Sequence, residues 1–283
     1  MSNINIAQSS PVLVDVGGRR LAATVLGQGE PFVLLETGFG VESAAWAAVA
    51  EAVAKFTRVC FYDRAGRGVS DPAHQPRQPA DLVQDAYRLL HSTAGASPCL
   101  YVGQSFGGLI ARLYAQQHPA DVAGIVLVDS FHEAQFETFA PLFPAVQPGE
   151  PVALTAMRTF WAGGWRDPAQ NKEGIDMQAC QVAGRSIATL GDIPLRVLTA
   201  QTYTHQVAPI FPAGGSLTNQ ALWEEMQSQF LRLSTDTTQC IIQESGYFIQ
   251  VDKPQVIGET IAELVENFRR TQSADQSHQA GRR

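Results

Sequence analysis

The hydrophobic pattern of this chain alternates between short apolar runs and longer segments with apolar residues at helical spacing. Continuous apolar runs predict buried strands at residues 32–35, 59–62, 100–102, 124–128, 194–199 and 240–242. Helical spacing predicts helices at residues 41–55, 79–91, 219–233 and 254–269, and another after residue 108. Residues 11–26 predict a hairpin around Gly17-Gly18. Because strands that are apolar throughout are buried on both faces, the pattern predicts a mostly parallel sheet flanked by helices.

The alternation stops after Asp129. Residues 131–192 show no clear strand pattern and are rich in proline and aromatic residues, namely Phe131, Phe136, Phe139, Phe143, Phe160, Trp161 and Trp165. This segment is predicted to be a helical cap inserted into a core formed by residues 1–130 and 193–271. The polar residues 272–283 are predicted to be a disordered tail.

A G-x-S-x-G motif lies between the apolar run at residues 100–102 and the helix that follows it. Its residues are Gly103-Gln104-Ser105-Phe106-Gly107. This layout is typical of a nucleophile elbow, in which a serine occupies a tight turn and small neighbours let backbones come close. The amide of Phe106 opens the helix and is placed to face a developing oxyanion. The alternative is a glycine-rich turn without chemistry.

Composition narrows the possible functions. The chain has 27 acidic and 20 basic residues, a net charge of −7, which gives no indication of binding to nucleic acid or to an anionic membrane. No window of about 18 apolar residues predicts a transmembrane helix, and the first ten residues lack the apolar core of a signal peptide. The four cysteines have no metal-ligand spacing. We therefore expect a cytoplasmic protein without a metal or organic cofactor.

Several further segments resemble the α/β-hydrolase fold superfamily, and within it a bacterial group of serine hydrolases and esterases. The similar segments are residues 35–40 (LETGFG), 62–66 (YDRAG), 127–130 (LVDS) and 245–254 (SGYFIQVDKP). The resemblance covers nearly the whole chain. It implies an eight-stranded, mostly parallel sheet flanked by helices, a lid after the sixth strand, and a Ser-acid-His triad in that chain order.

The resemblance also implies roles for individual residues. Ser105 corresponds to the nucleophile. Asp129, after the sixth strand, is assigned as the acid because no carboxylate follows the seventh strand before Glu224. The amides of Phe39 and Phe106 correspond to the oxyanion-hole donors. Alternatively, Asp129 is a strand-end aspartate that only caps the following turn, and residues 38–40 form a simple tight turn.

The chain departs from the family at the general base, because Tyr247 occupies the position of the expected histidine. A phenol with a pKa near 10 is ionised in only about one molecule in a thousand at neutral pH, so it is a poor base. His205, which follows a strand at the same edge as Ser105, is the first candidate for a substitute base, ahead of His132. Alternatively, both histidines only make contacts at the surface or within the cap.

These residues predict a serine hydrolase that acts on a carboxylic ester or lactone, with activity impaired or altered by Tyr247. A change from His to Tyr needs only one nucleotide substitution in the codon. The tyrosine is therefore consistent both with an engineered variant and with a natural protein that has lost the histidine. Two alternatives are a lyase or cyclase that uses Tyr247 as proton donor, and a ligand-binding protein that has lost catalysis. The aromatic cap predicts a small-molecule substrate with an apolar group, or alternatively the packing of a cap core. The sequence does not define the oligomeric state.

Overall fold

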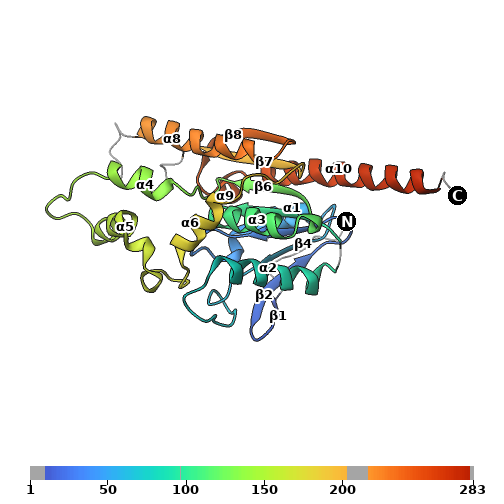
Figure 1. Ribbon diagram of the computed structural model, residues 1–283, viewed down its shortest axis with the longest axis horizontal. Helices are drawn as coiled ribbons and strands as arrows, with labels where there is room; N and C mark the ends of the chain where they lie inside the picture. Colours follow the sequence, from blue (N-terminus) through green and yellow to red (C-terminus); the bar gives the residue numbers. More distant parts are fainter. Residues whose placement is uncertain (1–9, 96, 203–215, 281–283) are drawn as a thin grey trace.

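The computed structural model describes residues 10–95, 97–202 and 216–280, and it contains one eight-stranded sheet (Figure 1). The strand order is β1-β2-β4-β3-β5-β6-β7-β8. Only the pairs β1–β2 and β2–β4 are antiparallel, and the other five are parallel. The strands are β1 (Val12–Asp15), β2 (Arg20–Leu26), β3 (Phe32–Glu36), β4 (Val59–Tyr62), β5 (Cys99–Gln104), β6 (Val122–Val128), β7 (Leu195–Thr202) and β8 (Thr237–Gly246).

Alternate residues along the inner strands face two separate hydrophobic clusters, one on each side of the sheet. On one side, β-strand residues pack against α2 (Pro79–Thr93), α3 (Phe106–Gln117) and α6 (Met177–Arg185). On the other side they pack against α1 (Ala47–Val53), α9 (Ile249–Asp252) and α10 (Pro254–Ala280). This arrangement confirms the predicted mostly parallel sheet and explains why its strands are apolar without alternation.

Most predicted elements are present, with changes at their ends. The hairpin around Gly17-Gly18 joins β1 to β2, and both glycines have positive φ angles of 84° and 90°. The helix predicted at residues 41–55 is divided into a 3₁₀ turn at Ser43–Trp46 and the shorter α1. The last strand extends well beyond the predicted residues 240–242. It continues to Gly246, because its edge position lets polar side chains lie exposed while the backbone still pairs with β7.

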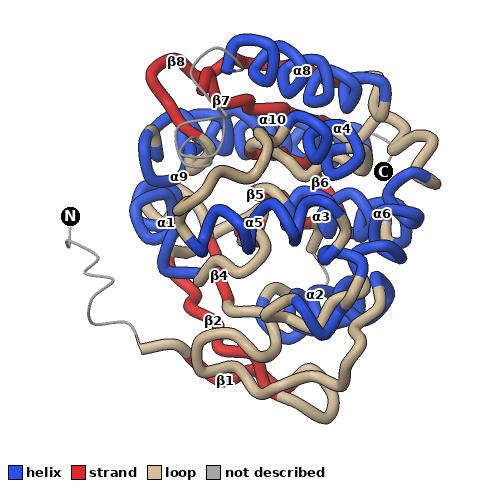
Figure 2. Tube along the Cα trace, turned by 90° about the vertical axis from the view of Figure 1, so that its left-hand side faces the viewer, coloured by secondary structure: helices blue, strands red, loops and turns tan. Residues whose placement is uncertain are grey.

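The residues between β6 and β7, which we call the insert (residues 131–192), contain no strand, and all of them are described. The insert contains α4 (Gln135–Phe139), α5 (Val152–Ala162), α6 and several 3₁₀ turns. It extends from the end of the sheet at which the parallel strands finish, on the left in Figure 1 and facing the viewer in Figure 2. α8 (Ser216–Ser228) packs beside β7. The division into a core and a separate cap stays a prediction.

The closing helix α10 is 27 residues long and projects beyond the rest of the molecule (Figure 1). It covers residues 272–280, where the sequence predicted a disordered tail, and residues 281–283 lie outside the described part. The residues of this stretch whose burial is described, 272–274, are exposed. Among the described helices, none is both long and apolar enough to cross a membrane.

Glycines allow α3 to lie unusually close to the ends of β3 and β6. A Cβ atom at Gly107 would lie 2.4 Å from the carbonyl oxygen of Glu36, and one at Gly108 would lie 2.2 Å from Oγ of Ser130. The first of these contacts is with backbone, which has little freedom to move. The close approach therefore depends on the absence of a side chain at Gly107.

We expect Gly107→Ala to lower the free energy of unfolding by about 1–3 kcal/mol, since the new methyl group collides with the end of β3. Gly258→Ala is the matched control. Gly258 also lies within a helix, but its added Cβ would make an ordinary 3.5 Å contact with Ala52. The control should be neutral or stabilising by up to about 1 kcal/mol, because alanine favours helix. Urea unfolding measures both, and equal effects would contradict the close-approach argument.

Candidate active site

Ser105 occupies a sharp turn between the end of β5 and the start of α3. Its φ of 50° and ψ of −119° place a non-glycine residue in the positive-φ half of the Ramachandran plot, which costs free energy that the surroundings must supply. The amide of Ser105 donates to the carbonyl of Val128 at 3.0 Å, and its carbonyl accepts from the amide of Phe131 at 2.8 Å. The amide of this strained residue is thus held by the last residue of β6, and its carbonyl by the segment that follows β6.

Asp129 follows β6 directly and is completely buried. Its Oδ1 accepts hydrogen bonds from the amide of Ala200 at 3.0 Å and from Nε1 of Trp223 at 2.8 Å. Its Oδ2 is also buried but makes no hydrogen bond to any residue that the structure describes. Burial raises the pKa of Asp129 to about 7, and the bonds from Trp223 and Ala200 only partly oppose this rise.

Tyr247 lies between β8 and α9, and its hydroxyl donates a hydrogen bond to Oγ of Ser105. Burial raises the pKa of Tyr247 above its usual value near 10, the hydrogen bond to Ser105 opposes the rise, and the charge of Asp129 adds to it. At neutral pH the phenol is therefore un-ionised, and it can donate a proton but is a weak acceptor. Ser105 and Tyr247, 142 residues apart in sequence, are in direct contact.

The loop after β3, which we call the Gly38 loop (residues 37–40), lies against the nucleophile candidate. A Cβ atom at Gly38 would lie 3.2 Å from Cβ of Ser105. The ring of Phe39 meets the ring of Phe106 edge-on, with centroids 6.2 Å apart. Phe106 begins α3, so its amide belongs to the first turn, where amides have no partner within the helix. Both predicted donor residues therefore lie beside Ser105, and their catalytic roles stay predictions.

The candidate replacement histidines lie in different places. His205 lies outside the described residues. His132 is buried, its Nδ1 accepts the amide of Ala134 at 3.2 Å, and its ring packs against Phe230 with centroids 5.4 Å apart. Burial lowers the pKa of His132. These contacts show that His132 packs locally, and its role as a substitute base stays a prediction.

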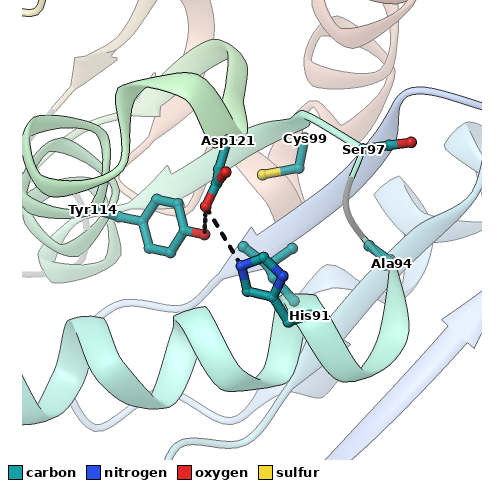
Figure 3. Close-up of a pocket in the computed structure, with 8 residues that line it drawn as sticks. His91, Ala94, Ser97, Cys99, Tyr114 and Asp121 are labelled. Atoms are coloured by element: carbon teal, nitrogen blue, oxygen red, sulfur yellow. Dashed lines mark hydrogen bonds and ion pairs between the residues drawn. The ribbon is translucent and has the colours of Figure 1, made fainter.

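Figure 3 shows His91 in a small pocket with Tyr114 and Asp121. Nε2 of His91 lies 3.5 Å from Oδ2 of Asp121, which also accepts a hydrogen bond from the hydroxyl of Tyr114 at 3.3 Å. Asp121 precedes β6 whereas Asp129 follows it. The pocket therefore lies at the end of the sheet where the parallel strands begin, and Ser105 lies at the end where they finish.

The aromatic residues of the insert fall into two groups. Phe136 and Trp165 are buried and stack on each other, with centroids 4.7 Å apart, so they form packing within the insert. Phe160 and Trp161 are only half-buried, and the ring of Phe160 stacks on Phe39 at 6.4 Å. Of the insert aromatics, Phe160 thus contacts the Gly38 loop.

Sequence reasoning assigned no role to three residues that the structure places at this site. Trp223 donates to Asp129, but the sequence placed it only within the predicted helix at residues 219–233. Arg64 was noted as part of the YDRAG segment, but without a function. Glu173, in the insert, bonds to Arg64. No local pattern connects these residues with the motif serine. Among the described residues, no cluster of three or more His, Cys, Asp or Glu side chains is placed to hold a metal ion.

Comparison with other proteins places this chain in a family. Residues 30–181 match the family model of the α/β-hydrolase fold. That match covers more than half of the chain, and the chain belongs to this family. It includes β3, β5, the Ser105 turn and Asp129, which are the elements that build the site.

Two sequence relatives and one solved structure illustrate the likeness. A probable transporter, efuK, from Hormonema carpetanum is 33% identical over 150 residues, which are 50% of this chain but 21% of that protein. The pimeloyl-[acyl-carrier protein] methyl ester esterase of Chromobacterium violaceum is 41% identical over 110 residues, 38% of this chain and 40% of the esterase. The chain thus matches less than half the length of either relative. A thermophilic esterase from Thermogutta terrifontis has the same fold, with a TM-score of 0.62, 19% identity, and coverage of 92% of this chain and 98% of its own.

The buried Asp129 leads to a prediction about pH. Because the folded protein holds the Asp129 proton up to about pH 7 while the unfolded chain releases it near pH 4, this group lowers the free energy of unfolding as the pH rises through that range. As the pH rises from 5 to 8, we expect the free energy of unfolding of Asp129→Asn to increase by about 2 kcal/mol relative to that of the parent.

The control for this experiment is Asp71→Asn. Hydrogen bonds from Arg20 lower the pKa of the half-buried Asp71 carboxyl, so that it is ionised at both pH values in the folded and the unfolded chain. The stability difference between Asp71→Asn and the parent should therefore stay constant from pH 5 to pH 8 in urea titrations. A constant difference for Asp129→Asn as well would show that Asp129 ionises normally in the folded protein.

Proposed function

We propose that this protein is a serine hydrolase that acts on a carboxylic ester or lactone and that lacks its general base in the present sequence. Ser105 is the nucleophile, Asp129 is the acid, and the amides of Phe39 and Phe106 are the oxyanion-hole donors. The observation that carries the proposal is the position of Tyr247. Its hydroxyl contacts Oγ of Ser105, while Oδ2 of Asp129 is buried and accepts no hydrogen bond from the residues that the structure describes. A histidine side chain at this position would supply a donor for Asp129 and an acceptor for Ser105.

The chemistry fails at the first step in the present sequence. For Oγ of Ser105 to attack a carbonyl carbon, its proton must pass to a base as the bond forms. The neutral phenol of Tyr247 already directs its own proton toward Oγ of Ser105, so it opposes this transfer. The amides of Phe39 and Phe106 would still stabilise an oxyanion. We therefore expect weak turnover, with residual catalysis from binding and from the oxyanion donors.

Two further observations support an ester-type substrate. The solved Thermogutta terrifontis protein is an esterase and the Chromobacterium violaceum relative is a methyl ester esterase, and the likeness to the latter extends over 110 residues. The half-buried Phe160, stacked on Phe39 next to Ser105, offers an apolar surface to a small-molecule substrate. We propose an apolar acyl or alcohol group at this position.

Restoring the histidine tests the proposal. We expect Tyr247→His to raise turnover of p-nitrophenyl esters by about 10²–10⁴, which is the usual contribution of a positioned general base. The same variant should become labelled at Ser105 by a fluorophosphonate probe, detected by intact mass. Adding Ser105→Ala to Tyr247→His should abolish both signals.

Phe248→His is the matched control, since it introduces an imidazole one residue further along the same segment, where we expect no gain. The proposal would be wrong if folded Tyr247→His showed neither labelling nor increased turnover. Equal labelling of the unchanged protein and of Tyr247→His would also count against it, because another group would then be activating Ser105.

The raised pKa of Tyr247 favours one second candidate, a lyase or cyclase reaction in which the phenol acts as proton donor. A group that is neutral at pH 7 and directed into the site is suited to protonating a leaving group or a carbanion. Tyr247→Phe removes the donor and keeps the ring. If the unchanged protein converts a substrate without hydrolysis, this substitution should abolish that conversion, and unchanged conversion would eliminate the candidate.

A further inference from the structure

A buried cluster of three charged side chains lies beneath the Gly38 loop. Glu36 is completely buried at the end of β3, and Arg64 and Glu173 are each only 3% exposed. Arg64 Nη1 donates to Glu36 Oε1 at 2.8 Å. Arg64 also forms a two-pronged ion pair with Glu173, from Nε to Oε2 at 2.8 Å and from Nη2 to Oε1 at 2.7 Å. The cluster joins three separate parts of the chain, because Glu173 belongs to the insert.

Arg64 also binds the backbone of the Gly38 loop directly. Its Nη1 donates to the carbonyl of Thr37 at 2.6 Å, and its Nη2 donates to the carbonyl of Gly38 at 2.8 Å. In a trans peptide the C=O and N–H groups point in opposite directions. A Gly38 carbonyl held toward Arg64 therefore turns the amide of Phe39 away from Arg64. The orientation of this proposed oxyanion donor depends on the guanidinium.

Glu173 holds the other side of the same loop. Its Oε1 accepts the amide of Gly40 at 2.7 Å, in addition to Nη2 of Arg64. Burial disfavours the Glu173 carboxylate, but the charge and hydrogen bonds of Arg64 more than compensate and lower its pKa below the usual value. One carboxylate from the insert thus contacts both Arg64 and the loop that Arg64 orients.

We propose that Glu173 is a positioning residue that couples the insert to the Gly38 loop, and through it sets the direction of the Phe39 amide. A movement of the insert around Glu173 would release the Gly40 amide and one side of the Arg64 guanidinium together. The effect on turnover rests on the proposed hydrolase function, whereas the effect on the loop does not.

A purely structural role for this ion pair makes a different prediction. Buried ion pairs often add little net stability relative to apolar packing, but removing one partner is destabilising because it leaves the other charge unpaired. If stability were its only role, loss of Glu173 would lower the free energy of unfolding and leave the loop and the chemical step unchanged. The two roles are therefore separable by measurements made on the folded protein.

The first measurement is amide hydrogen exchange of residues 37–41 in the otherwise unchanged protein. We expect Glu173→Ala to speed exchange of this segment by about ten-fold, since the Gly40 amide loses its acceptor. Glu173→Gln keeps an oxygen acceptor and should give a smaller increase, and it serves if the alanine variant fails to fold. The control is Asp85→Asn, which alters the buried pair of Asp85 with Arg77 (2.9 Å). It should leave exchange of residues 37–41 unchanged.

The second measurement uses ester turnover in the Tyr247→His protein. We expect added Glu173→Ala to lower kcat by about 10²-fold with KM changed less than about two-fold, the pattern expected when an oxyanion donor is displaced. Asp85→Asn should leave both constants within about two-fold. Unchanged exchange in the Glu173 variants, or a fall in kcat no larger than that of Asp85→Asn, would overturn the proposal.

The two measurements separate this inference from the proposed function. Absence of turnover in Tyr247→His alone would refute the hydrolase proposal, and exchange of residues 37–41 would then decide the coupling by itself. Turnover in Tyr247→His together with unaltered exchange in Glu173→Ala would retain the hydrolase and refute the coupling.

Discussion

The close approach of α3 to the sheet is the constraint on which the rest of this site depends. α3 begins one residue after β5 ends, so the chain must reverse its local geometry within Ser105, which takes a positive φ of 50°. The turn brings the start of α3 close to the end of β3, and the absence of a side chain at Gly107 leaves room for this approach to Glu36. The amide of Ser105 is bound to the end of β6 at Val128, and its carbonyl accepts the amide of Phe131, so the same turn also holds the segment after β6. Asp129 and the Gly38 loop are thereby brought to one edge of the sheet.

The sequence was sufficient to predict the sheet, because its determinants are local. Apolar runs without alternation require burial on both faces, and the G-x-S-x-G motif supplies a turn between one such run and a helix. The same reasoning placed Asp129 at the end of β6. Local patterns did not connect Ser105 with Tyr247, and only the resemblance to a family placed these distant residues in one site.

The sequence was not sufficient to predict the charged network behind the site. Arg64 and Glu173 are 109 residues apart, and Trp223 and Asp129 are 94 apart, so neither pairing has a periodicity that could indicate it. A buried arginine is also indistinguishable in sequence from an exposed one. Burial lowers the pKa of His132, and this burial comes from tertiary packing, including the contact of its ring with Phe230. Long-range partners of polar residues thus set the limit of what composition and spacing can show.

The orientation of α10 has a practical consequence. The helix starts at Pro254, a few residues after Tyr247, and its 27 residues span about 40 Å. Its far end therefore stands clear of the sheet, away from the insert (Figure 1). A fluorophore or a solid support attached there would be separated from Ser105 by most of the molecule. The far end of α10 is therefore a suitable attachment point for immobilising the protein with the site around Ser105 facing solution.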